Sequence, residues 1–196
     1  MHKYLLDTIC FGTVVLIWII GAIYNYYKVT VIKRRKSATK GWLLVIIILI
    51  SIISLISNSS RKLITYNVPY LNIIGSIILI IFTIFTIWSR LILGKMWASD
   101  ALIKENHKLR VKGPYSITRH PIYTGMLGML LGSTLRNGIG VEWLVFVCLI
   151  VYFKLKIKNE EKLLIEIFGE QYQTFKKTTP QLFPTLKSIK NSIKLN

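Results

Sequence analysis

The stretch YLNIIGSIILIIFTIFTIWSRLIL, which runs from Tyr70 to Leu93, carries a single charged residue near its end. A helix needs about 20 predominantly apolar residues to cross a bilayer, and this stretch is long enough. Pro69 comes directly before it, where proline commonly occupies the first turn of a helix. The stretch therefore predicts a membrane-spanning helix and makes an all-α, polytopic membrane protein the expected fold class.

Four further apolar blocks surround this helix, at Leu5–Tyr27, Gly41–Ser57, Ile122–Leu135 and Val141–Phe153. The first lacks a small-residue cleavage site, so we expect a retained span rather than a signal peptide. The second is barely long enough to cross a bilayer. The last two are short, but the tight-turn pair Asn137-Gly138 between them favours a helical hairpin with both halves in the membrane. A re-entrant or interfacial hairpin is the alternative. With both halves of the hairpin in the membrane, the expected number of spans is about five.

Composition and charge support the same class. The 196 residues are 53% hydrophobic and 17% charged, with a formal net charge of +18 and a mean hydropathy of +0.51. The basic residues cluster beside the apolar blocks, which fits anionic lipid head groups, and no nucleic-acid-binding motif is present. The positive-inside rule then predicts an integral protein of the cytoplasmic membrane or an endomembrane, with the N-terminus outside and the C-terminus in the cytoplasm.

The chain divides by composition into an N-terminal three-span segment, residues 1–93, and a region with more polar chemistry, residues 94–196, which we expect to form one integrated domain. The tail NEEKLLIEIFGEQYQTFKK predicts a C-terminal amphipathic cytoplasmic helix, because Leu164, Phe168, Tyr172 and Phe175 recur near one helical face. Gly169 interrupts this pattern and favours a bend. Cys10 and Cys148 lie in apolar stretches and predict neither a disulfide nor a metal site.

Polar chemistry gathers in GPYSITRHPIYTG, Gly113 to Gly125, at one edge of the expected membrane region. Pro121 predicts a helix start, so Arg119 and His120 should lie at a helix N-terminus, which attracts anionic groups. Tyr115 and Tyr123 offer aromatic faces that can hold a cation. Taken singly, the arginine can snorkel to phosphates, the histidine can cap the helix, and the tyrosines can belong to an interface belt.

Adjacent acids, Glu160 and Glu161, follow the last apolar block in a chain with only eight acidic residues. Carboxylates at a membrane edge are costly unless paired or solvated. Pairing with nearby basic residues is one reading, and binding of a cationic ligand or acceptance of a proton is the other. Neighbours on a helix point about 100° apart, so we expect only one, Glu161, to face a site.

These two segments together resemble the isoprenylcysteine carboxyl methyltransferase family of integral-membrane enzymes, which is related to the phospholipid methyltransferases. The family pattern is G-P-Y, then R-H-P-x-Y-x-G, a helical hairpin, E-E-x-x-L-x-x-x-F-G-x-x-Y and a later proline, and the LGKMW stretch from Leu93 to Trp97 resembles the L-G-x-x-W that precedes it. The matching positions are Gly113, Pro114, Tyr115, Arg119, His120, Pro121, Tyr123, Gly125, Glu160, Glu161, Leu164, Phe168, Gly169, Tyr172 and Pro184. The resemblance covers about half of the chain, with Lys156 or Lys158 where the family often has arginine.

The resemblance implies an S-adenosylmethionine-dependent methyltransferase that acts on a lipid or prenylated acceptor from the bilayer. It implies that the cofactor lies between the R-H-P segment and the C-terminal helix. Gly113, Pro114, Tyr115, His120, Pro121, Tyr123, Glu160 and Glu161 are the expected cofactor-binding residues, and Arg119 and Glu161 the expected catalytic ones.

The sequence leaves open which chemical group accepts the methyl group and which residue acts as its base. A carboxylate acceptor needs no base, whereas a phenol, an enol or an ammonium group must lose a proton to Glu161 or His120. The rival class is a small transporter or a structural membrane protein that keeps the motif for packing. Transporters usually show broken spans at mid-depth, and this chain gathers its unusual residues at one interface instead.

Overall fold

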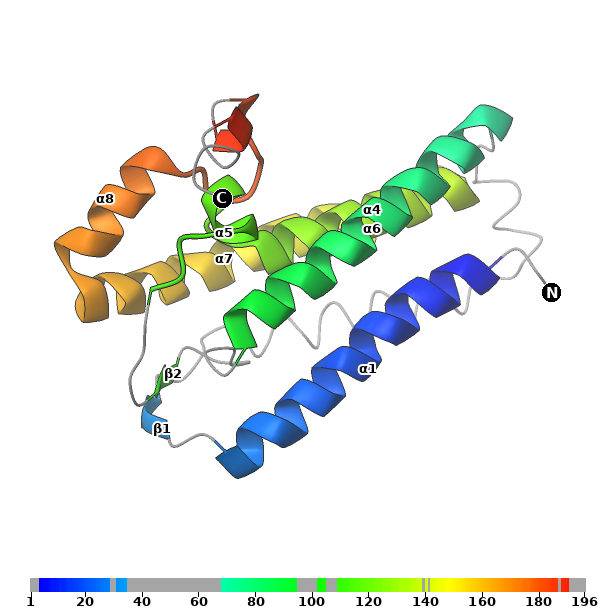
Figure 1. Cartoon of the computed structure of the whole chain (residues 1–196). Coiled ribbons are helices and arrows are strands. Elements are labelled where there is room, and N and C mark those ends of the chain that lie inside the picture. The colour runs from blue at the N-terminus through cyan, green and yellow to red at the C-terminus, as the bar shows by residue number, and fades with distance from the viewer. Residues whose placement is uncertain are drawn as a thin grey trace.

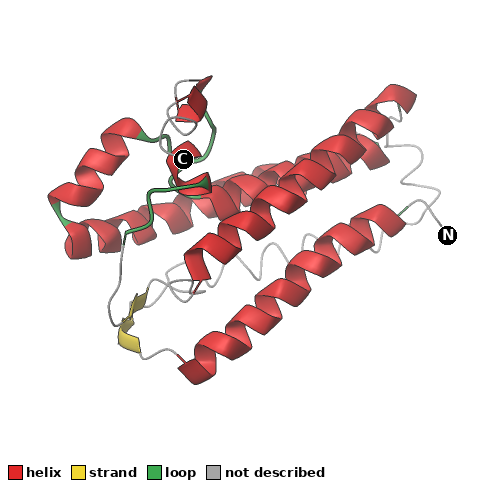
Figure 2. Cartoon of the chain, in the orientation of Figure 1, coloured by secondary structure: helices red, strands yellow, loops and turns green. Residues whose placement is uncertain are grey.

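The computed structural model describes residues 4–28, 31–34, 68–94, 102–104, 109–138, 140, 142–186 and 188–190. Its elements are α1 (Leu5–Lys28), β1 (Val31–Arg34), α4 (Pro69–Leu93), β2 (Leu102–Lys104), α5 (Pro114–Ile117), α6 (Pro121–Asn137), α7 (Glu142–Phe168) and α8 (Glu170–Thr178). The helical class is confirmed, with one short two-stranded ribbon that the sequence did not predict (Figures 1 and 2). The predicted span Gly41–Ser57 lies outside the described residues.

Two of the described helices are long and apolar enough to cross a membrane, over Leu5–Tyr27 and Tyr70–Leu93. Both match the predicted spans, and the second begins at Pro69 as expected. Only 17% and 22% of their most apolar windows are buried inside the protein, so most of their isoleucine and leucine side chains point outward. The core helix of a soluble protein would be mostly buried, and these outward-facing apolar surfaces suit lipid instead.

Glycines set the close crossing between α4 and α6 (Figure 1). A Cβ at Gly132 would lie 2.5 Å from the backbone nitrogen of Leu79, and a Cβ at Gly75 would overlap the backbone of Arg136. A Cβ at Gly128 would overlap the ring of Phe82. Gly75, Gly128 and Gly132 therefore lie on a helix–helix contact face.

A polar cluster ties together the N-terminal ends of α1 and α4 and the C-terminal end of α6. Arg136 forms an ion pair with Asp7 through Nη1 and Oδ2, and its Nε donates to Ser76 Oγ at 3.1 Å. Ser133 Oγ donates to Asp7 Oδ1 at 2.6 Å, and Asn72 Nδ2 donates to the Arg136 carbonyl at 3.1 Å. Polar groups in an apolar region are stable only when they satisfy one another, and these do.

The opposite ends of α1 and α4 lead to the strand pair. β1 and β2 run antiparallel, with Val31 opposite Lys104 and Arg34 opposite Leu102. The pair joins the basic segment that follows α1 to the one that follows α4 (Figure 1). β1 and β2 therefore lie together beyond one end of α1 and α4, while the Asp7–Arg136 cluster lies at the other end of these helices.

The C-terminal region differs from the expected arrangement. α7 is one continuous helix from Glu142 to Phe168, so the first part of the predicted amphipathic tail helix extends the second half of the predicted hairpin. Neither glycine nor proline occurs in this sequence, and a change from apolar to polar residues does not by itself end a helix. The break comes at Gly169, whose φ of 52° favours glycine, and α8 then turns back towards α5 (Figure 1).

Candidate functional site

The G-P-Y motif forms a turn against the end of α4. Gly113 has a φ of 61° and precedes α5, and Pro114 occupies the first position of that helix. The Tyr115 side chain is buried, and its hydroxyl donates to the Ser89 carbonyl at 3.4 Å rather than to either glutamate. These three predicted cofactor residues therefore have visible roles in shaping and anchoring the loop that leads to the R-H-P segment.

A C-terminal segment, Pro180–Leu182, crosses the start of α6 and holds the R-H-P backbone in place. The backbone N–H of Arg119 donates to the Pro180 carbonyl at 2.8 Å, and that of His120 donates to the Gln181 carbonyl at 3.2 Å. Thr124 Oγ1 donates to the Leu182 carbonyl at 2.6 Å. Sequence reasoning missed this contact, because backbone pairing between an irregular segment and a helix start has no residue-type signature.

Arg119 and Glu161 form a buried ion pair between the start of α6 and α7. Arg119 Nε donates to Glu161 Oε1 at 2.9 Å, and Nη2 lies 2.8 Å from the same oxygen. Each side chain is 8% exposed. Arg119 Nη1 also donates to the backbone carbonyls of Lys176 and Thr179, so the guanidinium caps the last turn of α8.

Lys176, which sequence reasoning did not single out, adds a second cation to this carboxylate. Its Nζ lies 3.0 Å from Glu161 Oε2. Burial by itself raises the pKa of the Glu161 carboxyl, but the contacts with His120, Lys176 and Arg119 outweigh it and hold the pKa well below its ordinary value. Glu161 lies beyond the apolar part of α7 and stays ionised throughout the physiological pH range.

His120 lies between the two glutamates. Its Nδ1 is 3.7 Å from Glu160 Oε2, and its Nε2 is 3.5 Å from Glu161 Oε1. Glu160 also accepts a 2.6 Å hydrogen bond from the Tyr123 hydroxyl and is the more open acid, with 20% of its side chain exposed. Both glutamates therefore approach the same imidazole, from opposite sides. Which of them faces a ligand stays a prediction.

Tyr123 is enclosed by its neighbours. Its ring stacks on Phe153 at 4.7 Å between centroids and on His120 at 5.9 Å. Lys156, the predicted basic residue before the paired acids, places its Nζ 5.7 Å from the centre of the same ring. The tyrosine therefore contributes its hydroxyl to Glu160, while its ring fixes the histidine against α7.

Two buried polar atoms in this region lack a hydrogen-bond partner among the described residues, namely His120 Nε2 and the Tyr172 hydroxyl. Nε2 nevertheless lies 3.5 Å from Glu161 Oε1 and contributes to the low pKa of that carboxyl. Tyr172 is 1% exposed, and burial, together with the Glu161 carboxylate, raises the pKa of its phenol. Both groups therefore belong to the polar surroundings of Glu161.

Within the described ranges, no group of three or more histidine, cysteine, aspartate and glutamate side chains is placed to hold a metal ion. The cluster instead combines a helix N-terminus, an imidazole, two carboxylates and two phenols. This set suits a ligand that carries both positive and negative charge.

Comparison with known proteins gives the class. A phospholipid methyltransferase family model matches residues 70–171, from the start of α4 into α8 and through the whole R-H-P and Glu-Glu arrangement. The match covers more than half of the chain. The protein therefore belongs to the phospholipid methyltransferase family.

Individual relatives confirm the resemblance to the isoprenylcysteine methyltransferases. The chain is 32% identical over 83 residues to protein-S-isoprenylcysteine O-methyltransferase of Schizosaccharomyces pombe, a match that covers 42% of this chain and 35% of that one. It is 39% identical over 74 residues to methanethiol S-methyltransferase of Pseudomonas deceptionensis, a match that covers 37% of this chain and 27% of that one. The chain thus spans about a third of the length of these curated relatives.

The fold is also similar to that of a solved membrane enzyme. A eukaryotic intramembrane Ras methyltransferase, an isoprenylcysteine carboxyl methyltransferase, superposes with a TM-score of 0.55 at 17% sequence identity. The superposition covers 87% of this chain and 53% of the other. The helical arrangement described above is therefore shared with an intramembrane methyltransferase.

Proposed function

We propose that this protein is an S-adenosylmethionine-dependent methyltransferase of the membrane, and that it methylates a lipid-linked acceptor. One observation carries the proposal. Residues that lie some 40 positions apart in the sequence, His120 and Tyr123 on one side and Glu160 and Glu161 on the other, meet at the N-terminus of α6. Membership of a methyltransferase family supports the same activity.

The side chains of the cluster fit the cofactor by charge. S-adenosylmethionine carries a carboxylate, an ammonium group and a sulfonium, and when bound it supplies an electrophilic methyl group. The N-terminus of α6, which begins at Pro121, suits the carboxylate. Glu160 is the more open of the two acids and suits one of the positive groups.

The contacts favour different roles for the two glutamates. Glu161 binds Arg119 and Lys176 and is held ionised, so it is a poor proton acceptor, and it suits a positioning role that fixes α7 to α6 and α8. Arg119 is likewise engaged with Glu161 and with α8 carbonyls. Glu160 and His120 are therefore the groups that we propose for contact with ligand, and either can take a proton from an acceptor that must lose one.

The acceptor is proposed only as a class. The relatives named above transfer to oxygen in one case and to sulfur in the other, so membership alone does not select the atom. The outward apolar surfaces of α1 and α4 favour an acceptor that arrives through the bilayer. Lipid extracts of cells with and without the protein, compared by mass spectrometry, should differ by a methyl group in the natural acceptor.

Calorimetric titration of the purified protein with S-adenosylmethionine tests the activity class. The wild type should bind, and Glu160→Gln should bind about ten- to a hundredfold more weakly, since a charge-assisted contact contributes about 1.5–3 kcal/mol. Glu166→Gln, an exposed acid two turns further along α7, is the matched control and should bind like the wild type. Absence of binding by the wild type up to millimolar cofactor would support the rival class of a non-enzymatic membrane protein.

A further inference from the structure

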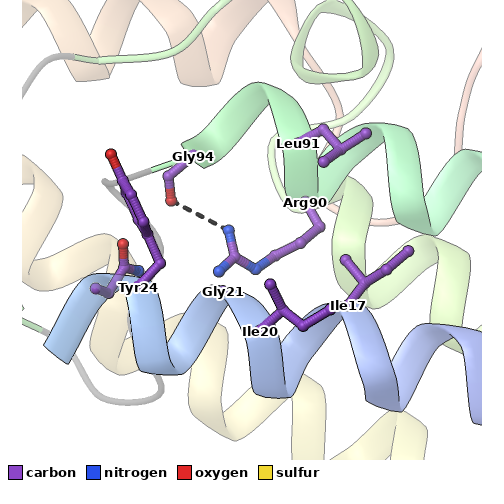
Figure 3. A pocket seen from close by; sticks show the side chains of 8 residues that line it. Ile17, Ile20, Gly21, Tyr24, Arg90, Leu91 and Gly94 are labelled. Atoms are coloured by element: carbon purple, nitrogen blue, oxygen red, sulfur yellow. Dashed lines mark hydrogen bonds between the residues drawn. The ribbon is translucent and has the colours of Figure 1, made fainter. Parts of the chain in front are cut away.

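A cavity of about 550 Å³ opens between α1 and α4, away from the glutamates (Figure 3). It lies where the two candidate spans end and lead to β1 and to the polar segment after Gly94. None of its lining residues belongs to the cluster at the start of α6. The lining residues are Ile17, Ile20, Gly21, Tyr24, Asn25, Arg90, Leu91 and Gly94.

Arg90 is the one charged residue in that lining, and its guanidinium points from α4 across the cavity towards α1 (Figure 3). Its Nη1 donates to the Gly94 carbonyl at 3.1 Å, and the guanidinium carbon lies 5.9 Å from the Trp18 ring centre. A Cβ at Gly21 would overlap Nη2, so the guanidinium lies directly against the backbone of α1. The arginine is 4% exposed, and ionisable residues within spans are expensive and usually functional.

Apart from Asn25 and the Tyr24 hydroxyl, the other side chains of the cavity wall are apolar, and the wall continues onto the lipid-facing surface. Ile20 and Leu91 line the cavity and are 58% and 65% exposed. Tyr24, at 48% exposure, stands at the rim as interfacial aromatic residues do. A guanidinium with apolar walls that merge with the outer surface of two spans matches an amphiphile with an anionic head.

We propose that the Arg90 pocket binds the phosphate head group of an anionic phospholipid of the bilayer, with the acyl chains lying along α1 and α4. A guanidinium presents its N–H groups in a fork that matches phosphate oxygens, and basic pockets between spans recognise anionic head groups. A free phosphate ion would gain nothing from the isoleucine and leucine walls. The inference does not depend on the proposed methyl transfer, because it concerns a separate site.

Titration of the purified full-length chain in a non-ionic detergent tests the pocket, with lipid binding followed by native mass spectrometry and by the unfolding temperature. Dioleoyl phosphatidylglycerol should bind and raise the unfolding temperature more than dioleoyl phosphatidylcholine. Inorganic phosphate at equal concentration should have little effect. Equal effects of both lipids, or an equal effect of phosphate, would overturn the proposal.

Substitutions in and near the pocket test where the lipid binds. Arg90→Gln should lower the affinity for phosphatidylglycerol at least about tenfold and abolish the preference over phosphatidylcholine. Arg110→Gln, which removes an exposed arginine outside the pocket, should leave both unchanged. Ile20→Trp narrows the pocket at an exposed position and keeps the charge, so it should weaken binding even if Arg90→Gln does not fold. Wild-type affinity in Ile20→Trp would show that the lipid binds elsewhere and would refute the assignment.

Discussion

At the scale of residues, the site depends on how each polar side chain is satisfied rather than on its chemical type. Glu160 and Glu161 are the same amino acid at adjacent positions, yet one contacts a phenol and an imidazole while the other is enclosed by Arg119 and Lys176. A carboxylate surrounded by cations stays charged and rigid. Glu160 is the more exposed of the two, which supports the proposed division between a structural Glu161 and a ligand-binding Glu160.

Glu161→Gln should lower the stability of the folded protein. It should also make that stability depend less on pH. The pKa of Glu161 is depressed in the folded protein relative to an ordinary value of about 4.3, so folding favours its ionised form. That contribution is present above about pH 4.3 and is lost as the pH falls through the folded pKa. The variant should lose about 1.5–3 kcal/mol at neutral pH and show a smaller acid-side decline.

Unfolding temperatures measured from pH 7 to pH 3 check this prediction, with Glu160→Gln as the partner variant. Glu160 has fewer charged contacts, so its variant should unfold close to the wild type at neutral pH while binding cofactor weakly. Equal acid-side decline in wild type and Glu161→Gln would contradict a stabilising role for the Glu161 charge. Equal loss of stability in both variants would contradict the proposed division of roles.

At the scale of elements, the crossing of α4 and α6 fixes the position of the R-H-P segment. Gly132 and Gly75 allow backbone contact between the two helices, and Arg136 then reaches both α1 and α4 at one end. At the other end, the start of α6 is clamped by Pro180–Leu182 and by α8. The helix is therefore held at both ends, which keeps its N-terminus aligned with α7.

Gly132→Ala should destabilise the protein by roughly 1–3 kcal/mol, because its Cβ would lie 2.5 Å from the Leu79 backbone and neither helix backbone can move freely. Gly12→Ala is the matched control, since a Cβ at Gly12 meets nothing within 4 Å and alanine favours a helix. Thermal unfolding in detergent measures both. Similar unfolding temperatures for the two variants would show that the close crossing does not limit stability.

At the scale of the whole molecule, the two ends of the helices carry different chemistry. The Asp7–Arg136 cluster lies at one end, and the strand pair, the R-H-P segment and the glutamates lie towards the other (Figure 1). The absolute orientation, with the glutamates facing the cytoplasm, is the prediction of the positive-inside rule.

Cysteine labelling in intact cells tests that orientation, in a background with Cys10→Ala and Cys148→Ser. Tyr4→Cys, at the exposed N-terminal end of α1, should react with an impermeant thiol reagent. Lys190→Cys, in the exposed tail, should react only after the membrane is opened. Labelling of Lys190→Cys from outside would reverse the orientation, because every basic segment was assigned by the same rule.

Much of the element structure followed from the sequence for simple reasons. Long apolar runs predicted α1 and α4, Pro121 predicted the start of α6, and Gly169 predicted a break. The strand pair and the continuity of α7 were not predicted. Pairing between two short distant segments has no local pattern, and the polar half of α7 looked like a separate helix only because its composition changes.

The sequence by itself determined the membrane class, the family resemblance and the candidate site residues of the motif, because hydrophobic length, glycine and proline positions and motif spacing are local properties of the chain. Only the tertiary structure decided what those residues do to one another. It placed His120 between both glutamates, closed Arg119 and Lys176 around Glu161, and enclosed Tyr123. It also aimed Arg90 into an apolar pocket. Partners and burial depend on helix crossings between distant segments, and they set the charge and availability of each group.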